Sequence, residues 1–414
     1  MAGKDRPVPP TWHDVPAPAG AARSTVVFRG HDFGWGSAGK LHAVLTELTA
    51  RTAHPPRLIG VGTVLGRSLL AQLPVDTWYD QWPSTTGELR NLLRRHGVTA
   101  ALVVLDSEFA AALLAAGCPT VFVDSLPYLW TGNDTIPHDA TRYCAQLCES
   151  LPRTCWEPLR RIERLTWTEA ILSAPPPTRR AGTPGLAVLN FGGLHSPFGE
   201  GSAHAYPRLV AEPAVRALSD AGFHTVEICG NVDTAMLPEQ DTTPGVAVNA
   251  GPRSHEEFLD LLDRAQLLVT SPGLTTLLEA GQRRLPTVCL PPQNVSQILN
   301  GNRFAAAVDA ACRVPWPSEV LDPRQVDAVR AQGEHAALTV VYGAIERAAR
   351  QTHSWVRQRL HRDITTAIEH SRGVRDWGGL LGRTGGRGAH QVVQRLTEVL
   401  AEHSAPAPVS QGAG

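Results

Sequence analysis

The chain has 414 residues, which at ~100–200 residues per domain predicts two or three domains. Apolar residues make up 43% and charged residues 19%, so the chain can bury a large core. The 38 basic and 39 acidic residues nearly cancel and form no basic block, which disfavours nucleic acid as a partner. No apolar run approaches the ~20 residues that span a bilayer, and the Pro-rich start lacks the apolar core of a signal peptide. We therefore expect a soluble, cytoplasmic protein without a membrane partner.

The first half of the chain predicts an α/β domain. Residues 1–23 are rich in Pro and Ala and are expected to form a disordered tail. Over residues 24–173, short β-branched runs alternate with longer helical patterns, as in βα units with a parallel sheet. The expected strands are Thr25–Arg29, Arg57–Val61, Ala101–Leu105 and Thr120–Val123.

The loop after the first strand carries His31 and Asp32 and then Gly34, Gly36 and Gly39. The three glycines match the GxGxxG pattern of dinucleotide-binding loops. That reading also needs an acidic residue at the end of the second strand, where none occurs. NAD is therefore disfavoured as a cofactor. For His31, an ordinary exposed loop residue is the alternative to a functional one.

Polar and aromatic residues follow the fourth strand. Asp124 ends the strand, and Tyr128 and Trp130 come a few residues later. Aromatic rings beside a carboxylate can stack on, and hydrogen-bond to, a flat molecule such as a nucleobase. The alternative is a set of core aromatic residues over a turn.

Several cysteines lie further along the first half. Cys144 and Cys148 are one helical turn apart, with Cys155 and His138 nearby, so a zinc site can be considered. No tight CxxC pair is present, and buried thiols are the simpler interpretation. We therefore expect no metal.

A second α/β domain is predicted after a Pro- and Gly-rich linker at 174–185. Its expected strands are Leu186–Asn190, His224–Cys229, Gly245–Asn249, Leu267–Thr270 and Thr287–Leu290, with helices at Ala203–Ala221 and Ser254–Ala265. We place this domain at 186–322, a helical segment at 323–404 and a disordered tail at 405–414. Two such domains face each other across a cleft, where substrates commonly bind.

The most informative motif follows the strand that ends at Thr270. A turn over Ser271 and Gly273 leads into a helix that opens near Leu274. Amide groups in the first turn of a helix have no partner inside it, and the helix dipole favours an anion there. The hydroxyls of Thr275 and Thr276 add donors, and Glu279, one turn further on, can accept both hydroxyls of a ribose. The alternative is Ser271 as an N-cap with an exposed Glu279.

Two further loops at strand ends carry suitable groups. Gly192 and Gly193 follow the first strand of the second half, and glycines allow a backbone to approach a phosphate closely. The loop after the last strand carries amides, among them Asn294 and Gln297, which suit the neutral hydroxyls of a sugar. Each loop alone is also compatible with an ordinary turn.

The order strand, turn, Gly-x-x-x-x-x-Glu-Ala-Gly, strand, Pro and Gln-x-x-Asn resembles the donor half of GT-B nucleotide-sugar glycosyltransferases over about residues 186–305. The resemblance implies an α/β fold of two Rossmann-like domains, a UDP-sugar as co-substrate and no cofactor. It implies that the diphosphate is held by Gly192, Gly193, Ser271, Gly273, Thr275 and Thr276, the ribose by Glu279 and the sugar by Gln297. Ser271-Pro-Gly replaces the frequent His-Cys-Gly, and Ser296 replaces an Asp that meets the sugar hydroxyls, for which Asn294 can substitute. The donor sugar therefore stays open.

In the same family the first-half loop faces the donor and often supplies the catalytic base. The resemblance thus assigns that role to His31 or Asp32, and acceptor binding to Asp124, Tyr128 and Trp130. Residues 32–41 and 123–130 are also similar to the cytosylglucuronate synthase family, which joins cytosine to glucuronate from UDP-glucuronate in the nucleoside antibiotic biosynthesis of actinomycetes. An acceptor that attacks from the face opposite the leaving UDP inverts the anomeric carbon, and helix N–H groups at 273–276 with the Gly192–Gly193 loop can stabilise the leaving charge without a metal.

A glucuronate carboxylate needs a cation, and the sequence does not choose among Arg29, Lys40, Arg253 and Arg303. Three alternatives stay open: a UDP-sugar transferase acting on another natural product, a non-hydrolysing sugar-nucleotide epimerase or sugar phosphorylase, and a non-catalytic binding protein. The expected partners are a UDP-sugar and a small acceptor. The sequence does not indicate an oligomeric state.

Overall fold

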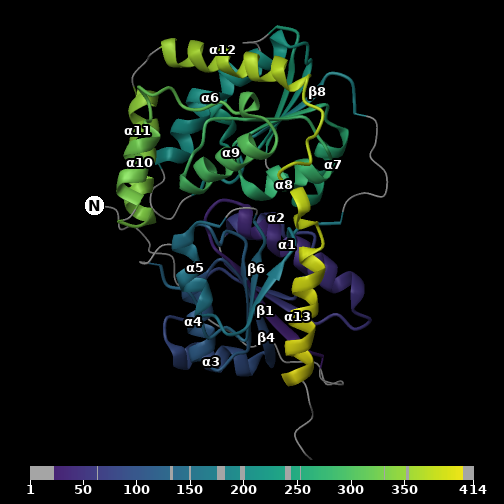
Figure 1. The fold of residues 1–414 in the computed structure, drawn as a ribbon. Coiled ribbons are helices and arrows are strands. Elements are labelled where there is room, and N and C mark those ends of the chain that lie inside the picture. Colours follow the sequence, from purple (N-terminus) through teal and green to yellow (C-terminus); the bar gives the residue numbers. More distant parts are fainter. Residues whose placement is uncertain are drawn as a thin grey trace, which may run out of the picture.

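A computed structural model describes residues 23–62, 64–130, 134–148, 151–174, 182–195, 201–237, 244–251, 253–330, 332–350 and 354–403. The predicted tails, apart from residue 23, and most of the predicted linker lie outside the described residues. The described chain forms two halves stacked one above the other, each built around a parallel sheet (Figure 1).

The first half contains a seven-stranded parallel sheet in the order β3-β2-β1-β4-β5-β6-β7. The strands are β1 Thr25–Gly30, β2 Arg57–Val61, β3 Thr77–Tyr79, β4 Val98–Val104, β5 Thr120–Asp124, β6 Arg142–Gln146 and β7 Leu165–Thr168. The helices are α1 Gly36–Arg51, α2 Val64–Leu69, α3 Thr86–Arg95, α4 Ser107–Ala115 and α5 Arg153–Arg160. The four predicted strands are confirmed, and β3, β6 and β7 are additional.

The second half contains a five-stranded parallel sheet in the order β10-β9-β8-β11-β12. Its strands are β8 Leu186–Asn190, β9 Thr225–Cys229, β10 Ala247–Gly251, β11 Leu267–Thr270 and β12 Thr287–Cys289. Its helices include α6 Gly201–Asp220, α7 His255–Arg264, α8 Leu274–Gln282 and α9 Val295–Ala307. Central strands such as β8 are buried along their whole length, because helices cover both faces of a parallel sheet.

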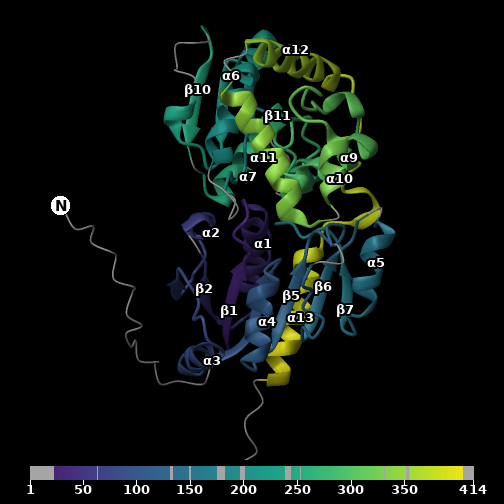
Figure 2. The same ribbon diagram turned by 90° about the vertical axis from the view of Figure 1, so that its left-hand side faces the viewer.

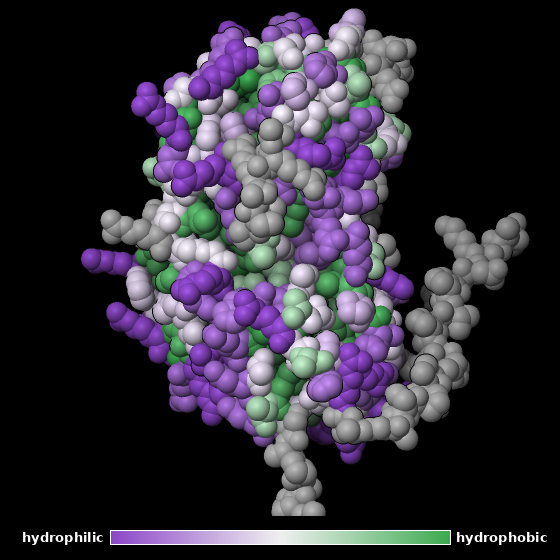
Figure 3. Space-filling view, turned by 90° about the vertical axis from the view of Figure 1, so that its right-hand side faces the viewer, coloured by the Kyte–Doolittle hydropathy of each residue, from purple (hydrophilic) through white to green (hydrophobic). Residues whose placement is uncertain are grey.

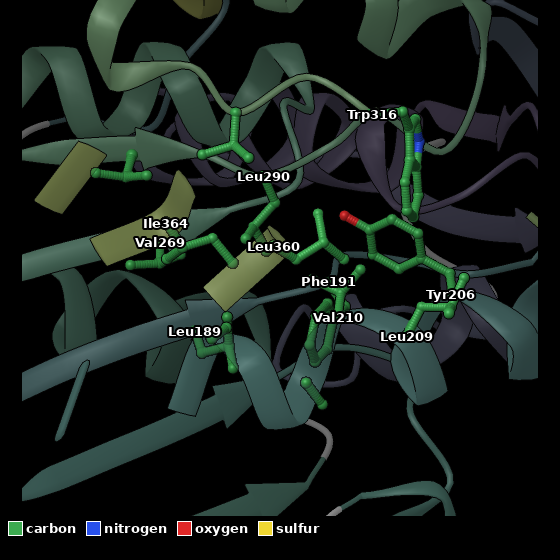
Figure 4. Packing of buried hydrophobic residues seen from close by; sticks show 14 of the residues in the cluster. Leu189, Phe191, Tyr206, Leu209, Val210, Val269, Leu290, Trp316, Leu360 and Ile364 are labelled. Carbon is green, nitrogen blue, oxygen red and sulfur yellow. The ribbon is translucent and has the colours of Figure 1, made fainter. Parts of the chain in front are cut away.

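Aromatic packing supports the core of the second half (Figure 4). The Tyr206 ring of α6 lies between Phe191 and Trp316, with ring centroids 5.9 Å away on each side in edge-to-face geometry. Its hydroxyl donates a hydrogen bond to the Pro291 carbonyl oxygen at 2.6 Å. This bond ties α6 to the segment between β12 and α9, which carries Asn294 into the site described below.

The C-terminal helices divide between the two halves. The helices are α10 Pro323–Arg330, α11 Glu334–Arg350, α12 Ser354–Ser371 and α13 Gly388–His403. Helices α11 and α12 pack on α6, whereas α13 returns to the first half and lies along its sheet (Figures 1 and 2). Val392 and Leu396 of α13 are buried in one cluster with Val26 and Phe28 of β1. The predicted segment 323–404 is therefore helical but serves both halves.

Both sheets reverse their strand order beside their first strand. In the first half β1 pairs with β2 on one side and β4 on the other, and in the second half β8 pairs with β9 and β11. In open α/β sheets, ligands bind beyond the carboxyl ends of the strands at such switch points. The loops after β1, β4, β8 and β11 are therefore the places to search for a site.

The surface is mixed in character. On the face shown in Figure 3, hydrophilic residues predominate and hydrophobic ones are scattered among them. Among the described residues, none of the helices combines the length and hydrophobicity that crossing a membrane requires.

Candidate active site between the two halves

A cavity lies between the two sheets and is lined by residues of both halves. From the first half, His31 and Trp130 line it; from the second half, Gly192, Thr275 and Glu279 do so. The wall also includes Leu105 and Ser271, so the loops after β1, β4, β8 and β11 all contribute to it. The structure thus brings together residues predicted from separate stretches of the sequence.

The N-terminus of α8 opens into this cavity without a side-chain cap. Gly273 is its N-cap residue, and no side chain accepts a hydrogen bond from the first turn. The Ser271 hydroxyl instead donates to the Phe191 carbonyl oxygen at 3.1 Å, so the alternative of Ser271 as N-cap is not observed. Thr275 and Thr276 line the cavity from the first turn. Amide groups at such a helix start, aided by the helix dipole, suit a phosphate.

The Gly192–Gly193 loop lies beside α8 and is shaped by Asn190. The side-chain Oδ1 of Asn190 accepts a hydrogen bond from the Gly192 backbone N–H at 3.0 Å, and its side-chain Nδ2 donates to the Thr270 hydroxyl at 3.0 Å. Gly192 has φ +67°, a conformation that favours glycine. Gly193 packs on the backbone of Gly34, so this glycine also sets how closely the two halves approach.

A methyl group at position 193 should push the halves apart. An added Cβ would lie 2.7 Å from the carbonyl carbon of Gly34, a backbone atom that cannot rotate away. For Gly193→Ala we expect UDP, the ligand that the family resemblance implies, to bind about tenfold more weakly, within the usual cost of overpacking. Calorimetry measures the affinity, and small-angle scattering measures the separation of the halves. Gly87→Ala on α3 is the control, because nothing lies within 4 Å of its added Cβ. Wild-type affinity in Gly193→Ala would contradict the expectation.

Glu279 is a buried carboxylate on the cavity wall. Only 2% of the residue is exposed, so the alternative of an exposed Glu is not observed. Its Oε1 lies 3.0 Å from Nε2 of His255, which is within ion-pair distance. The angle at the His255 N–H does not meet the geometry of a hydrogen bond. Burial opposes ionisation, but the charges of His255, Arg283 and Lys40 outweigh it and lower the Glu279 pKa. Glu279 is therefore ionised near neutral pH and can accept hydrogen bonds from hydroxyls.

His31 faces the same cavity from the first half. Burial lowers its pKa below 6.5, with the nearby Asp106 carboxylate opposing that shift. The imidazole is therefore neutral near pH 7 and can accept a proton. Asp32 is not part of the cavity wall, and its carboxylate lies 3.3 Å from Arg29, which also binds Asp106 at 2.5 Å. Of the two candidate bases, the structure places His31 in the cavity.

The predicted acceptor residues divide into one that lines the cavity and two that lie behind it. Trp130 lines the cavity, and its indole N–H donates to Asp124 at 2.7 Å. Asp124 is fully buried and also accepts a hydrogen bond from the Tyr143 hydroxyl at 2.9 Å. Burial raises the Asp124 pKa to about 6, although the hydrogen bonds from Trp130 and Tyr143 lower it in part. Tyr128 is buried and donates to Asn300. Asp124 therefore holds Trp130 in place, and Tyr128 links the two halves.

The loop before α9 places Asn294 and Gln297 on the cavity wall. Asn294 caps α9: its side-chain oxygen accepts from the Gln297 amide at 3.0 Å and from the Ser296 hydroxyl at 2.8 Å. The side-chain oxygen of Gln297 accepts from the Gln293 amide at 2.8 Å. Both side-chain oxygens are thus occupied as acceptors, and the hydrogen-bonding groups that these two side chains can offer a ligand in the cavity are their N–H donors.

Comparison with known proteins gives structural matches only. Neither a protein-family model nor a curated protein sequence matches this chain. A UDP-glucosyltransferase from Polygonum tinctorium capable of glucosylating indoxyl, in complex with 3,4-dichloroaniline, matches with a TM-score of 0.51 at 13% identity, covering 92% of this chain and 100% of the other. S. aureus MnaA in complex with UDP matches with a TM-score of 0.51 at 11% identity, covering 93% and 99%. The chain has a GT-B-like fold.

Within this GT-B-like fold, the N-terminus of α7 contributes wall residues that the sequence did not single out. Ser254, His255 and Phe258 line the cavity beside Arg253, whose guanidinium binds Glu227 at 3.0 Å. Ser254 forms a capping box, and its S-x-x-E pattern is visible in the sequence. That pattern marks the helix start, but only the fold shows that this start faces the cavity.

The C-terminal helices also reach the cavity, through Arg330 at the end of α10 and Glu334 at the start of α11. No local pattern marks either residue, because their position depends on how α10 and α11 pack on the second half. Of the four cations considered for a carboxylate, only Arg253 is on the wall. Among the described residues, no three His, Cys, Asp or Glu side chains converge to hold a metal ion.

Proposed function

We propose that this chain is a glycosyltransferase that moves a sugar from a UDP-sugar to a small acceptor. One observation carries the proposal: the uncapped start of α8 and the ionised Glu279 one turn later share a cavity with a neutral His31 from the opposite half. The α8 start can hold a diphosphate, Glu279 can hold a ribose, and His31 can accept a proton. The GT-B-like fold agrees with this arrangement but shows the architecture alone.

The donor nucleotide occupies the second half in this proposal. Its diphosphate meets the first-turn amides of α8, the hydroxyls of Thr275 and Thr276 and the Gly192–Gly193 loop. Its ribose hydroxyls donate to Glu279. The sugar then lies toward Asn294 and Gln297, whose amide groups contact its hydroxyls. No cofactor enters the proposal, since the UDP-sugar is a co-substrate.

The reaction is a displacement at the anomeric carbon. His31 takes the proton of the acceptor while the acceptor atom attacks from the face opposite the UDP, so the anomeric configuration inverts. The bond from the anomeric carbon to the phosphate oxygen breaks, and UDP leaves with the electron pair. The α8 amides then stabilise the charge that develops on the leaving diphosphate. In this proposal the protein supplies that stabilisation without a metal.

We further propose glucuronate as the sugar and N1 of cytosine as the acceptor atom, as in nucleoside antibiotic biosynthesis. This rests on the similarity of residues 32–41 and 123–130 to the cytosylglucuronate synthases, and on Trp130, a ring in the cavity on which a flat base can stack. A glucuronate carboxylate has two cavity arginines to bind, Arg253 and Arg330. Arg253 already binds Glu227 at 3.0 Å, so Arg330 is the preferred partner.

A UDP-release assay with a matrix of UDP-sugars against cytosine, other bases and small alcohols tests the proposal. We expect release with UDP-glucuronate plus cytosine, and none when either is omitted. UDP release with other donor–acceptor pairs would support the proposed transferase activity but contradict glucuronate and cytosine as its substrates. Conversion of the UDP-sugar without an acceptor would identify an epimerase instead. Tight UDP binding without release for any pair would identify a binding protein.

A further inference from the structure

Tyr128 belongs to the first half but is buried against the second half. It lies in the loop after β5, between the wall residues Leu126 and Trp130. Only 1% of Tyr128 is exposed, and it is not part of the cavity wall. Its hydroxyl donates a hydrogen bond to the side-chain oxygen of Asn300 on α9, and Asn300 is itself buried. Both partners are shielded from solvent, so removing one of them leaves the other unpaired at a cost.

Two arginines of the second half contact the rest of Tyr128. The guanidinium carbon of Arg303, on α9, lies 3.5 Å from the centroid of the Tyr128 ring, a cation–π arrangement. A guanidinium nitrogen of Arg330, at the end of α10, donates to the Tyr128 carbonyl oxygen at 3.4 Å. The hydroxyl, the ring and the backbone of Tyr128 therefore each meet a different residue of the second half. These contacts anchor the loop that carries Trp130 into the cavity.

Asn300 connects Tyr128 to the turn that precedes α8. The side-chain nitrogen of Asn300 donates to the Pro272 carbonyl oxygen at 3.1 Å. Pro272 lies between the wall residues Ser271 and Gly273, and Gly273 is the N-cap residue of α8. The Asn300 amide thus accepts from Tyr128 at one end and donates to this turn at the other. Two consecutive hydrogen bonds therefore join the acceptor loop of the first half to the diphosphate site of the second half.

We propose that Tyr128 is a positioning residue for the donor diphosphate: from the first half it orients the Asn300 amide, which holds the turn before α8. This role rests on the proposed UDP site and extends it, because the affinity for the nucleotide then depends on a hydroxyl of the opposite half that does not line the cavity. Without that hydroxyl, the Asn300 side chain is no longer fixed, since the χ2 torsion of an amide has broad minima. Its bond to Pro272 then weakens, and the α8 amides meet the diphosphate in a less defined geometry.

Tyr128→Phe tests this role, because it removes the hydroxyl alone. The ring remains for Arg303, and the backbone carbonyl remains for Arg330. We expect calorimetry to show UDP binding weakened by about three- to tenfold, the range that the loss of one neutral hydrogen bond covers. Binding of 2′-deoxy-UDP should weaken by the same factor, because the affected contacts are those of the diphosphate and not of the ribose. UDP affinity equal to that of wild type would overturn the role of Tyr128 and leave the proposed function intact.

Tyr79→Phe is the matched control. The Tyr79 hydroxyl lies 2.6 Å from Nε2 of His96, so this variant also loses a tyrosine hydroxyl contact, but one within the first half and away from the cavity wall. We expect both variants to unfold at a lower temperature, whereas only Tyr128→Phe should lose UDP affinity. Lower stability with unchanged affinity in Tyr128→Phe would reduce Tyr128 to a structural contact. If wild type itself binds no UDP, the proposed function fails, and the role of Tyr128 fails with it.

A double-mutant cycle with Asn300→Leu tests the route through Asn300. Leu has a side chain of similar size and can form neither of the two hydrogen bonds. If Tyr128 acts through Asn300, adding Tyr128→Phe to Asn300→Leu should weaken UDP binding no further. An additional loss as large as in Tyr128→Phe alone would overturn the route, because independent sites give additive changes. Asn300 is on the cavity wall, but its own contact with a nucleotide cancels when Tyr128→Phe is compared in the two backgrounds.

Discussion

Replacing His31 with Asn is expected to lower turnover by about 10²–10⁴-fold, the usual contribution of a general base, and to leave UDP affinity unchanged. The Asn side chain can still form a hydrogen bond but cannot accept the acceptor's proton near neutral pH. UDP affinity is preserved because the proposed contacts to the nucleotide come from the second half. A UDP-release assay measures the turnover, and calorimetry measures the binding.

The pH profile gives a second signature of His31. Burial lowers its pKa below 6.5. A base must be unprotonated, so the wild-type kcat/KM should be constant near neutral pH and should fall as the pH drops through that lowered pKa. In His31→Asn, this acidic limb should disappear from the remaining activity.

Asp32→Asn is the comparison variant, since Asp32 neighbours His31 in sequence and pairs with Arg29 away from the cavity wall. Its loss of turnover is expected to be smaller than that of His31→Asn. A larger loss in Asp32→Asn, with the acidic limb of the pH profile removed, would transfer the role of base to Asp32.

The strands that position the site are those that the sequence predicts best. Strands β1, β4, β8 and β11 are short, β-branched and apolar because both faces of a parallel sheet are covered. All positions of β3 and most positions of β7 are only half-buried, so the sequences of these two strands carry no clear apolar run. The packing of α13 on β1 joins residues far apart in the chain, and local periodicity contains no information about such a contact.

The same distinction applies to the site. Glu279 and the α8 start belong to one local motif, so their spacing is visible in the sequence. Asp124 and Lys40 also stand at informative places, but burial removes both from the cavity wall. Arg330 reaches the wall only through the packing of α10, which no motif encodes. Residue type and spacing thus predict where a site lies, whereas tertiary packing decides which side chains face it.

Glu279→Gln is expected to weaken UDP binding by about 10- to 150-fold, because hydrogen bonds to a charged group contribute about 1.5–3 kcal/mol. Gln keeps the size of the side chain and removes the negative charge that ribose hydroxyls would meet. The change also removes the negative charge that faces His255, Arg283 and Lys40, so part of the loss can come from a rearrangement of these neighbours and not from the ribose. Calorimetry with UDP measures the total loss.

Comparing UDP with 2′-deoxy-UDP separates these two contributions. Wild type should prefer UDP, because the deoxy compound lacks one of the hydroxyls that donate to Glu279. In Glu279→Gln that preference for UDP should shrink. A rearrangement of the charged groups around Glu279 would instead weaken the binding of both ligands equally. Glu346→Gln is the control, since Glu346 pairs with Arg350 on α11 and is not part of the cavity wall. An undiminished preference for UDP in Glu279→Gln would mean that the ribose binds elsewhere, and the nucleotide site would have to be reassigned.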